Sequence, residues 1–375
     1  MINFKMSMYS DIYNIIANYL PIQDSIKLQY LCKNLFEFRM EHFIFKEFNS
    51  KFLEKHFESI ERLEIRQVGK YKSVISDKIN DSIISKFKKL KYLVLPGNKD
   101  ITDNGLAYLK GIHTLDLYNN EKITDNGLVH LKGIHTLDLY GNKKITDKGL
   151  EHLKGVHTLD LSSSYKITDN GLVYLKGIQI LKLIFNQIIT DNGLVHLNGI
   201  HTLELAHNSK ITDNGLKHLK GIKTLKLWDD NDNNITDNGL VHLKGIEYLA
   251  LYYNKNITDN GIIHLKGIHT LVLPHNENIT DNGIIHLKGI HTLKLYSNNK
   301  ITDNGLTYLN GIKELILNNN KNITNNGLKN LRNIIKLNLW DNENITKNGL
   351  AQIKGCMFCN EKLRIGGFFR LKKIK

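Results

Sequence analysis

Two cysteines near the carboxyl end of the chain, Cys356 and Cys359, have the CxxC spacing of half a zinc site or a redox pair. Only 3 cysteines occur in 375 residues, the third being Cys32. So few cysteines argue against a disulfide scaffold and indicate a reducing compartment. Whether Cys356 and Cys359 do chemistry depends on where the fold places them.

Histidine is the second candidate, because most of the 17 histidines fall into two regular series. Stacked imidazoles could bind a metal or respond to pH. No set of carboxylates or cysteines converges on them, so we interpret both series as solvated surface and predict no metal site. One series is His113, His135, His157, His201, His269 and His291, and the other is His130, His152, His196, His218, His242, His264 and His286.

Catalytic motifs are absent from the sequence. It contains no GxxxxGK[ST], GxSxG or HExxH motif and no paired catalytic carboxylates. We therefore expect a protein that is not an enzyme and that needs no cofactor.

One hexapeptide, Ile-Thr-Asp-Asn-Gly-Leu at residues 101–106, organises most of the chain. A fixed period of this kind predicts a solenoid of stacked repeats. A degenerate copy at 79–100 keeps the same register, and every step is 22 residues except the 24 between Ile211 and Ile235. Further copies begin at Ile123, Ile145, Ile167, Ile189, Ile211, Ile235, Ile257, Ile279, Ile301, Ile323 and Ile345.

Each repeat predicts a short strand, a turn, a short helix and a second turn. Leu115 and Leu117 alternate with Asp116, as expected of a strand with one buried face. We expect the Asn120-type residues to form a ladder whose side chains hydrogen-bond to buried backbone groups of the turns. We expect Thr102 or Asp103 to cap the helix.

Two further leucines and a glycine complete the predicted helix. Leu106 and Leu109 should bury its inner face, and Gly111 should end it in the left-handed conformation. The same register puts Cys356 and Cys359 on slots of the Ile112 and Leu115 type, where cysteine packs as a small apolar residue.

The pattern Ile112-x-x-Leu115-x-Leu117-x-x-Asn120-x-x-Ile123 resembles the leucine-rich repeat over about three quarters of the chain. The ITDNGL segment is similar to the cysteine-containing subtype of F-box proteins, with Asn and Ile at the cysteine slots and a shorter unit. The resemblance implies an α/β repeat fold, a solenoid with a parallel concave sheet and short convex helices.

Residues 8–35 resemble an F-box, the helical module that docks the Skp adaptor of a cullin-type ubiquitin ligase. Asp11, Asp24 and Lys33 match its polar positions, whereas Met8-Tyr9 replaces the opening Leu-Pro and Leu35 the closing Trp. By this resemblance the adaptor-binding residues are Ile12, Ile16, Tyr19, Leu20, Leu31 and Cys32.

These resemblances suggest four segments. They are an F-box-like helical domain at 1–36, a helical linker or cap at 37–78, leucine-rich repeats at 79–361 and a basic tail at 362–375. A diverged F-box before very uniform repeats is similar to proteins of amoebae or of the giant viruses that infect them.

The resemblance implies a substrate-recognition adaptor of an SCF-type ubiquitin ligase, with an unknown target protein bound on the concave face. The outward strand positions differ while the rest of the unit repeats, and exposed aromatics there suit protein recognition. The predicted target-binding residues are Asp116, Tyr118, Asp138, Tyr140, Asp160, Lys182, Glu204, Lys226, Trp228, Tyr252, Lys294, Tyr296 and Trp340.

Two alternatives stay open. In the first, the chain is a plain interaction scaffold whose first helices only cap the repeats. In the second, the basic tail binds an anionic surface or nucleic acid, since the net charge is +14. Recurring lysines account for most of that charge, so nucleic acid is not the expected partner.

The sequence also bears on location. It has no apolar run long enough for a membrane span and no signal peptide. We expect a cytoplasmic or nuclear protein, in the host cell cytoplasm for a viral source.

Overall fold

The structure, a computed structural model, describes residues 42–45, 57–65, 79–206, 210–228, 234–351, 353 and 358–360. The chain forms two compact units, Met1–Leu161 (unit 1) and Ser162–Lys375 (unit 2). Both units are built from the same repeat.

Unit 1 pairs its strands side by side in chain order, and every pair is parallel. Its elements are β1 His42–Phe45, β2 Arg62–Ile65, α4 Asp81–Ile84, β3 Tyr92–Val94, α5 Asp103–Leu106, η3 Ala107–Leu109, β4 Thr114–Asp116, α6 Asp125–Leu128, η4 Val129–Leu131, β5 Thr136–Asp138, α7 Asp147–Leu150, η5 Glu151–Leu153 and β6 Thr158–Asp160.

Unit 2 follows the same rule. Its elements are α8 Asp169–Leu172, η6 Val173–Leu175, β7 Ile180–Lys182, α9 Asp191–Leu194, η7 Val195–Leu197, β8 Thr202–Ala206, α10 Asp213–Leu216, η8 Lys217–Leu219, β9 Thr224–Trp228, α11 Asp237–Leu240, η9 Val241–Leu243, β10 Tyr248–Tyr252, α12 Asp259–Ile262, η10 Ile263–Leu265, β11 Thr270–Val272, α13 Asp281–Ile284, η11 Ile285–Leu287, β12 Thr292–Lys294, α14 Asp303–Thr307, β13 Glu314–Ile316, α15 Asn325–Leu328, β14 Lys336–Asn338, α16 Lys347–Leu350 and β15 Phe358–Asn360.

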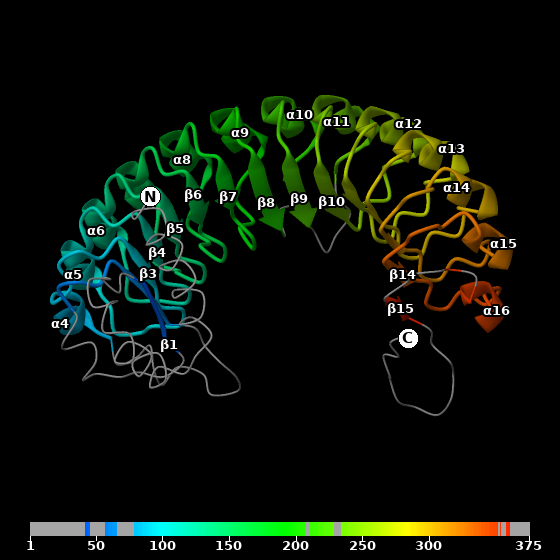
Figure 1. The fold of residues 1–375 in the computed structure, drawn as a ribbon. Helices are drawn as coiled ribbons and strands as arrows, with labels where there is room; N and C mark the ends of the chain where they lie inside the picture. The colour runs from blue at the N-terminus through cyan, green and yellow to red at the C-terminus, as the bar shows by residue number, and fades with distance from the viewer. Residues whose placement is uncertain are drawn as a thin grey trace, which may run out of the picture. The chain divides into compact units, whose positions relative to one another are not determined.

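The core of each unit lies between its strands and its short helices, which line opposite sides of the repeats (Figure 1). Leu115 pairs in register with Leu137, and Leu137 with Leu159, and all three are fully buried. Leu106 and Leu109 close the core from the helix, at 0 % and 2 % exposure. The predicted leucine-rich-repeat solenoid is confirmed.

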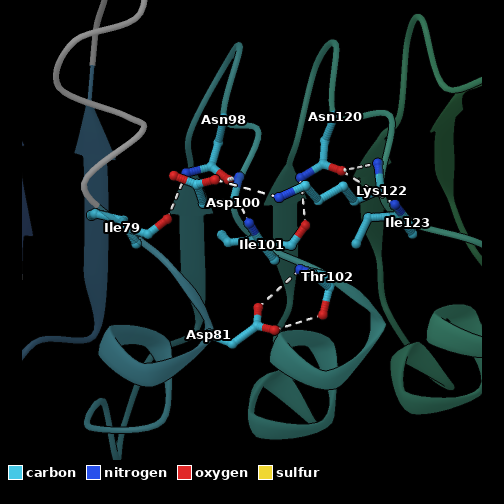
Figure 2. Close-up of polar contacts among 9 residues, drawn as sticks. All are labelled: Ile79, Asp81, Asn98, Asp100, Ile101, Thr102, Asn120, Lys122 and Ile123. Carbon is cyan, nitrogen blue, oxygen red and sulfur yellow. Dashed lines mark hydrogen bonds and ion pairs between the residues drawn. The ribbon is translucent and has the colours of Figure 1, made fainter.

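The predicted asparagine ladder is present beside the strands (Figure 2). Asn98, fully buried, donates its Nδ2 to the Ile79 carbonyl at 2.7 Å and accepts at Oδ1 from the amides of Asp100 and Ile101. Asn120 does the same one repeat later, donating to the Ile101 carbonyl at 2.9 Å. Each asparagine thereby satisfies backbone groups that the turn would leave unpaired in the core.

The Thr102 and Asp103 positions have separate tasks. Thr102 is the N-cap of α5 and accepts from the Asn104 amide. Asp103 instead reaches the next repeat, where it accepts from the amide of Thr124 at 2.8 Å and from its hydroxyl at 2.6 Å. The interpretation of Asp103 as a cap was therefore wrong; it fastens one repeat to the next, as Asp81 does to Thr102 in Figure 2.

We call this pair of hydrogen bonds from a threonine to the aspartate of the preceding repeat the Asp–Thr clamp. It explains why the hexapeptide contains a glycine. A Cβ at Gly127 would lie 2.4 Å from the Asp103 Oδ1 and 2.9 Å from a Leu106 methyl group. Glycine is needed there because the preceding repeat's carboxylate lies directly against it. Gly111 is the predicted left-handed helix end, with φ of 80°.

Several predicted features fall partly or wholly outside the described residues. They are the F-box-like segment 1–36 with its six adaptor-binding residues, the tail 362–375, and Cys356. Where the 37–78 segment is described, it contains the strands β1 and β2, and β2 covers residues 63–65, where the repeat pattern also suggests a first, irregular strand. Cys359 lies in β15 as the register partner of Leu337, which is the slot the repeat predicts for it.

Candidate functional site: the sheet face

The sheet face of each unit consists of three columns of residues, one residue per repeat. The first outward column contains Asp116 and its equivalents, the second contains Tyr118 and its equivalents, and the turn column contains the next residue, Asn119 and its equivalents. All thirteen predicted target-binding residues lie in the first two columns and are at least partly exposed. The structure brings them together within each unit.

In unit 1 the first outward column carries the same charge in successive repeats. Asp116, Asp138 and Asp160 are register partners on β4, β5 and β6. Burial raises the pKa of the Asp116 carboxyl, and the charges of Asp160 and Glu64 raise it further, against a lowering by the Tyr118 amide. Like charges on neighbouring strands disfavour each other, so the charged form of Asp116 is disfavoured in the folded chain.

Aromatic rings flank the acidic column of unit 1. Tyr118 and Tyr140 stack in the second outward column, with ring centroids 4.7 Å apart. On the other side His113, His135 and His157 stack at 4.6 and 4.5 Å. Burial and the two flanking imidazoles lower the pKa of His135.

In unit 2 two lysines of the sheet face are paired with opposite charges on neighbouring strands. Lys226 lies 2.8 Å from Glu204, and Lys294 lies 2.9 Å from Glu314. Burial works against the charged Lys294 ammonium, but the hydrogen bond and the charge of Glu314 outweigh it and raise the pKa. Alternating signs thus make unit 2 locally self-neutralising.

The second outward column of unit 2 contains a stacked and partly exposed aromatic pair. Trp228 is 42 % exposed and stacks on Tyr252 with centroids 4.8 Å apart. Pro274 and Tyr296 occupy the next two positions of this column, and the amide of His275, which follows Pro274, donates to the Tyr296 carbonyl at 3.0 Å. Burial raises the pKa of Tyr252, as do Tyr248 and Tyr296. Pro274 is buried, so we call the three exposed or partly exposed rings, Trp228, Tyr252 and Tyr296, the aromatic shelf.

The turn column holds functional candidates that sequence reasoning missed. Its backbone is left-handed, and Gly97, Asn119 and Gly141 suit that conformation. Tyr253 adopts it with φ of 52° and His275 with φ of 59°, although bulky side chains rarely do so. The two rings stack at 4.9 Å beside the shelf. The signal in the sequence was a slot that holds Gly, Asn or Ser in most other described repeats, with Phe185 and Asp341 as the exceptions.

The helix side of the repeats is more uniform. It presents β-branched residues that are nearly half exposed, such as Val195, Val241 and Ile263. The second histidine series lies there, each member at least partly exposed. Among the described residues, no group of three or more His, Cys, Asp or Glu side chains is arranged to hold a metal, and no helix could cross a membrane.

Comparison with known proteins bears on the repeat itself. The family model described as "Leucine Rich repeat" matches residues 134–154 and 200–220. The chain contains leucine-rich repeats. Comparison with curated protein sequences finds no match.

Similar solved structures share the fold at low identity. A Listeria monocytogenes internalin, InlF, has a TM-score of 0.50 and 22 % identity over 82 % of this chain and 82 % of its own. A chain of the yeast Rad7–Elc1 complex has a TM-score of 0.54 and 16 % identity over 93 % and 92 %.

A longer relative matches only in part. A chain of the Drosophila Toll–Spatzle complex has a TM-score of 0.54 and 14 % identity over 81 % of this chain. The present chain spans about half of that relative's length, 47 %. At these identities the likeness concerns the leucine-rich-repeat fold.

Proposed function

We propose that this chain is a target-recognition adaptor whose sheet face binds a protein. The observation that carries the proposal is the contrast between a repeat that hardly varies and a sheet face that varies in charge and aromatic content. Leu115 and its register partners recur almost unchanged, whereas the first outward column changes from Asp160 to Lys182 and Glu204 and then to Ala250. Packing does not require that variety, because these side chains point away from the core.

The aromatic composition supports a protein partner over a small ligand. Trp and Tyr at the centre of an interface supply much of its binding energy, because they bury large areas with few rotatable bonds. Trp228 and Tyr118 are 42 % and 37 % exposed, on a scaffold held rigid by the asparagine ladder and the Asp–Thr clamps. A rigid scaffold loses little entropy on binding.

The finer proposal is that the adaptor serves an SCF-type ubiquitin ligase. Its support is the resemblance of residues 8–35 to an F-box, with Asp11, Leu20 and Cys32 among the matching positions. A further support is the similarity to a chain of the Rad7–Elc1 complex over 93 % of this chain. The F-box-like segment would bind a Skp-type subunit, and through it a cullin ligase. The sheet face would hold the target near the conjugating enzyme and raise its effective concentration there.

Co-purification tests the ligase link. The full chain and the Leu20→Asp/Leu31→Asp double variant are expressed with a Skp-type subunit, and the subunit recovered is quantified. We expect recovery with the wild type and loss with the variant. Equal recovery, or none with either chain, would reduce the proposal to an interaction scaffold without a ubiquitin link.

A further inference from the structure

We propose that the aromatic shelf of unit 2 binds an uncharged, proline-rich segment of the partner in the polyproline II conformation. This inference rests on the proposed function, because it assigns a ligand class to the same sheet face. Four observations carry it: the exposed stack, the residues at positive φ beside it, the internal pairing of the nearby charges, and the spacing of the rings.

The exposed stack provides contact area. Trp228 stacks on Tyr252, and 42 % of Trp228 is exposed. The exposed part of the indole can contact an incoming pyrrolidine ring, a contact that tryptophan and tyrosine commonly make with proline.

The turn column adds a second pair of rings at an energetic cost. Tyr253 is 39 % exposed and lies at φ of 52°, next to His275 at φ of 59°. A left-handed conformation penalises a side chain with a Cβ, and the same slot accepts Gly141 and Asn119 elsewhere in the chain. Costly conformations at an exposed surface point to binding sites.

The charges beside the shelf favour an uncharged partner. Lys226 and Lys294, which lie on either side of the shelf's centre, are held by Glu204 at 2.8 Å and Glu314 at 2.9 Å. An acidic or basic segment would have to compete with these pairs and would bring its own desolvation cost. Between them the first outward column contains Ala250 and Val272, which carry no charge and are 1 % and 3 % exposed.

The spacing of the rings selects the polyproline II conformation. Hydrogen-bonded strands lie about 4.8 Å apart, so Tyr252 and Tyr296, two strands apart, are separated by about 9.6 Å along the sheet. A polyproline II helix advances about 9.3 Å in three residues, which places prolines i and i+3 against these two rings. An extended β-strand repeats its side chains at about 6.7 Å and would match neither one strand spacing nor two.

The test uses a fluorescein-labelled poly-L-proline peptide of about twelve residues, a Gly-Ser peptide of equal length and an oligothymidylate of similar length. The chain has 2 tryptophans, so in a Trp340→Phe background Trp228 is the single indole reporter. We expect saturable binding of poly-L-proline by anisotropy, a matching change in Trp228 emission, and no comparable binding of the other two probes.

Variants locate the site. Trp228→Ala and Tyr296→Ala should each weaken poly-L-proline binding roughly tenfold or more. Tyr308→Ala is the matched control, because it removes an exposed tyrosine of unit 2 that lies at the end of helix α14, outside the shelf, and it should leave the affinity unchanged. Urea unfolding of each variant checks that the fold is intact. If one of the two shelf variants fails to fold, the other still tests the site.

The outcomes separate the ligand class from the function. Equal binding of proline and Gly-Ser peptides, oligothymidylate binding alone, or full affinity in both shelf variants would overturn the inference. If poly-L-proline fails to bind but Trp228→Ala still loses proteins that the wild type captures from cell extract, the ligand class is wrong and target recognition by the sheet face stands. If neither probe binding nor capture depends on Trp228, both proposals fall.

Discussion

The sheet faces of the two units share one repeat but treat charge in opposite ways. In unit 1, Asp116, Asp138 and Asp160 follow one another on neighbouring strands, beside stacked tyrosines and histidines. In unit 2, Glu204 and Glu314 are each paired with a lysine, beside the aromatic shelf. The repeat therefore determines where outward side chains lie, but not whether they are charged, aromatic or apolar.

The two faces should therefore respond differently to substitution, whereas the repeat beneath them should respond identically. That expectation can be tested at four levels, from the clamp that both units share to the single residues in which they differ.

The largest effect is expected at the shared glycine. Gly127→Ala in unit 1 and Gly261→Ala in unit 2 both place a Cβ within 2.4 Å of the preceding repeat's aspartate, Asp103 or Asp237. Overpacking of this kind costs about 2–4 kcal/mol, so both variants should lose similar stability in urea unfolding. The exposed neighbours provide controls, since Asn126→Ala and Asn260→Ala should change little. If alanine is tolerated in one unit but not in the other, the glycine is not needed for the same reason in both units.

Loss of the clamp carboxylate is the next effect. Asp103→Ala and Asp237→Ala each leave the amide and hydroxyl of the following threonine, Thr124 or Thr258, without the bonds of 2.5–2.8 Å that they donate. We expect a loss of about 1–3 kcal/mol in both units. Local hydrogen exchange at the two threonine amides provides a direct reading, and unchanged protection there would contradict the clamp.

The charge difference predicts effects of opposite sign. Asp116→Asn keeps the acceptor for the Tyr118 amide but removes a like charge, so it should stabilise the chain by up to about 1 kcal/mol at neutral pH. Glu204→Gln removes the partner of Lys226 and should destabilise by up to about 1 kcal/mol. Thermal unfolding measures both, and effects of the same sign would contradict the comparison.

The pH dependence of Asp116 follows from its raised pKa. The folded chain binds this proton more tightly than the unfolded chain does, so the penalty of the charged form is present at neutral pH. It should fall as the pH is lowered through the folded-state pKa. The gain from Asp116→Asn should therefore shrink in acid, and a gain that grew in acid would exclude this cause.

The smallest expected stability change is at the turn column. Tyr253→Asn loses the stack on His275 but places a residue that tolerates left-handed backbone at φ of 52°. The two effects, each about 1 kcal/mol, should nearly cancel. A loss well above 1 kcal/mol in urea unfolding would mean that Tyr253 is retained for packing rather than for binding.

The sequence predicted the repeat better than the contacts between repeats. Apolar spacing was sufficient to place Leu115, Leu117 and the Asn120 ladder, because burial and backbone satisfaction act within one unit. The role of Asp103 was missed because its partner, Thr124, lies 21 residues further on, and a helix N-terminus offers the same residue a local alternative.

The left-handed backbone of Tyr253 was also missed, for a different reason. Tyrosine itself carries no preference for positive φ, and the stacked turn imposes the conformation on whatever residue occupies the slot. The outward columns could be located from the register, but whether their charges accumulate or cancel depends on which strands lie side by side.

The central claim is that the sheet face, and not the helix side, recognises a partner. The most direct measurement is quantitative affinity capture from the relevant cell extract with wild type, Trp228→Ala and Val241→Ala, the last two being similarly exposed at 42 % and 47 % on opposite sides of unit 2. We expect that partners bound by the wild type are retained by Val241→Ala and lost by Trp228→Ala. Retention by Trp228→Ala together with loss by Val241→Ala would contradict it.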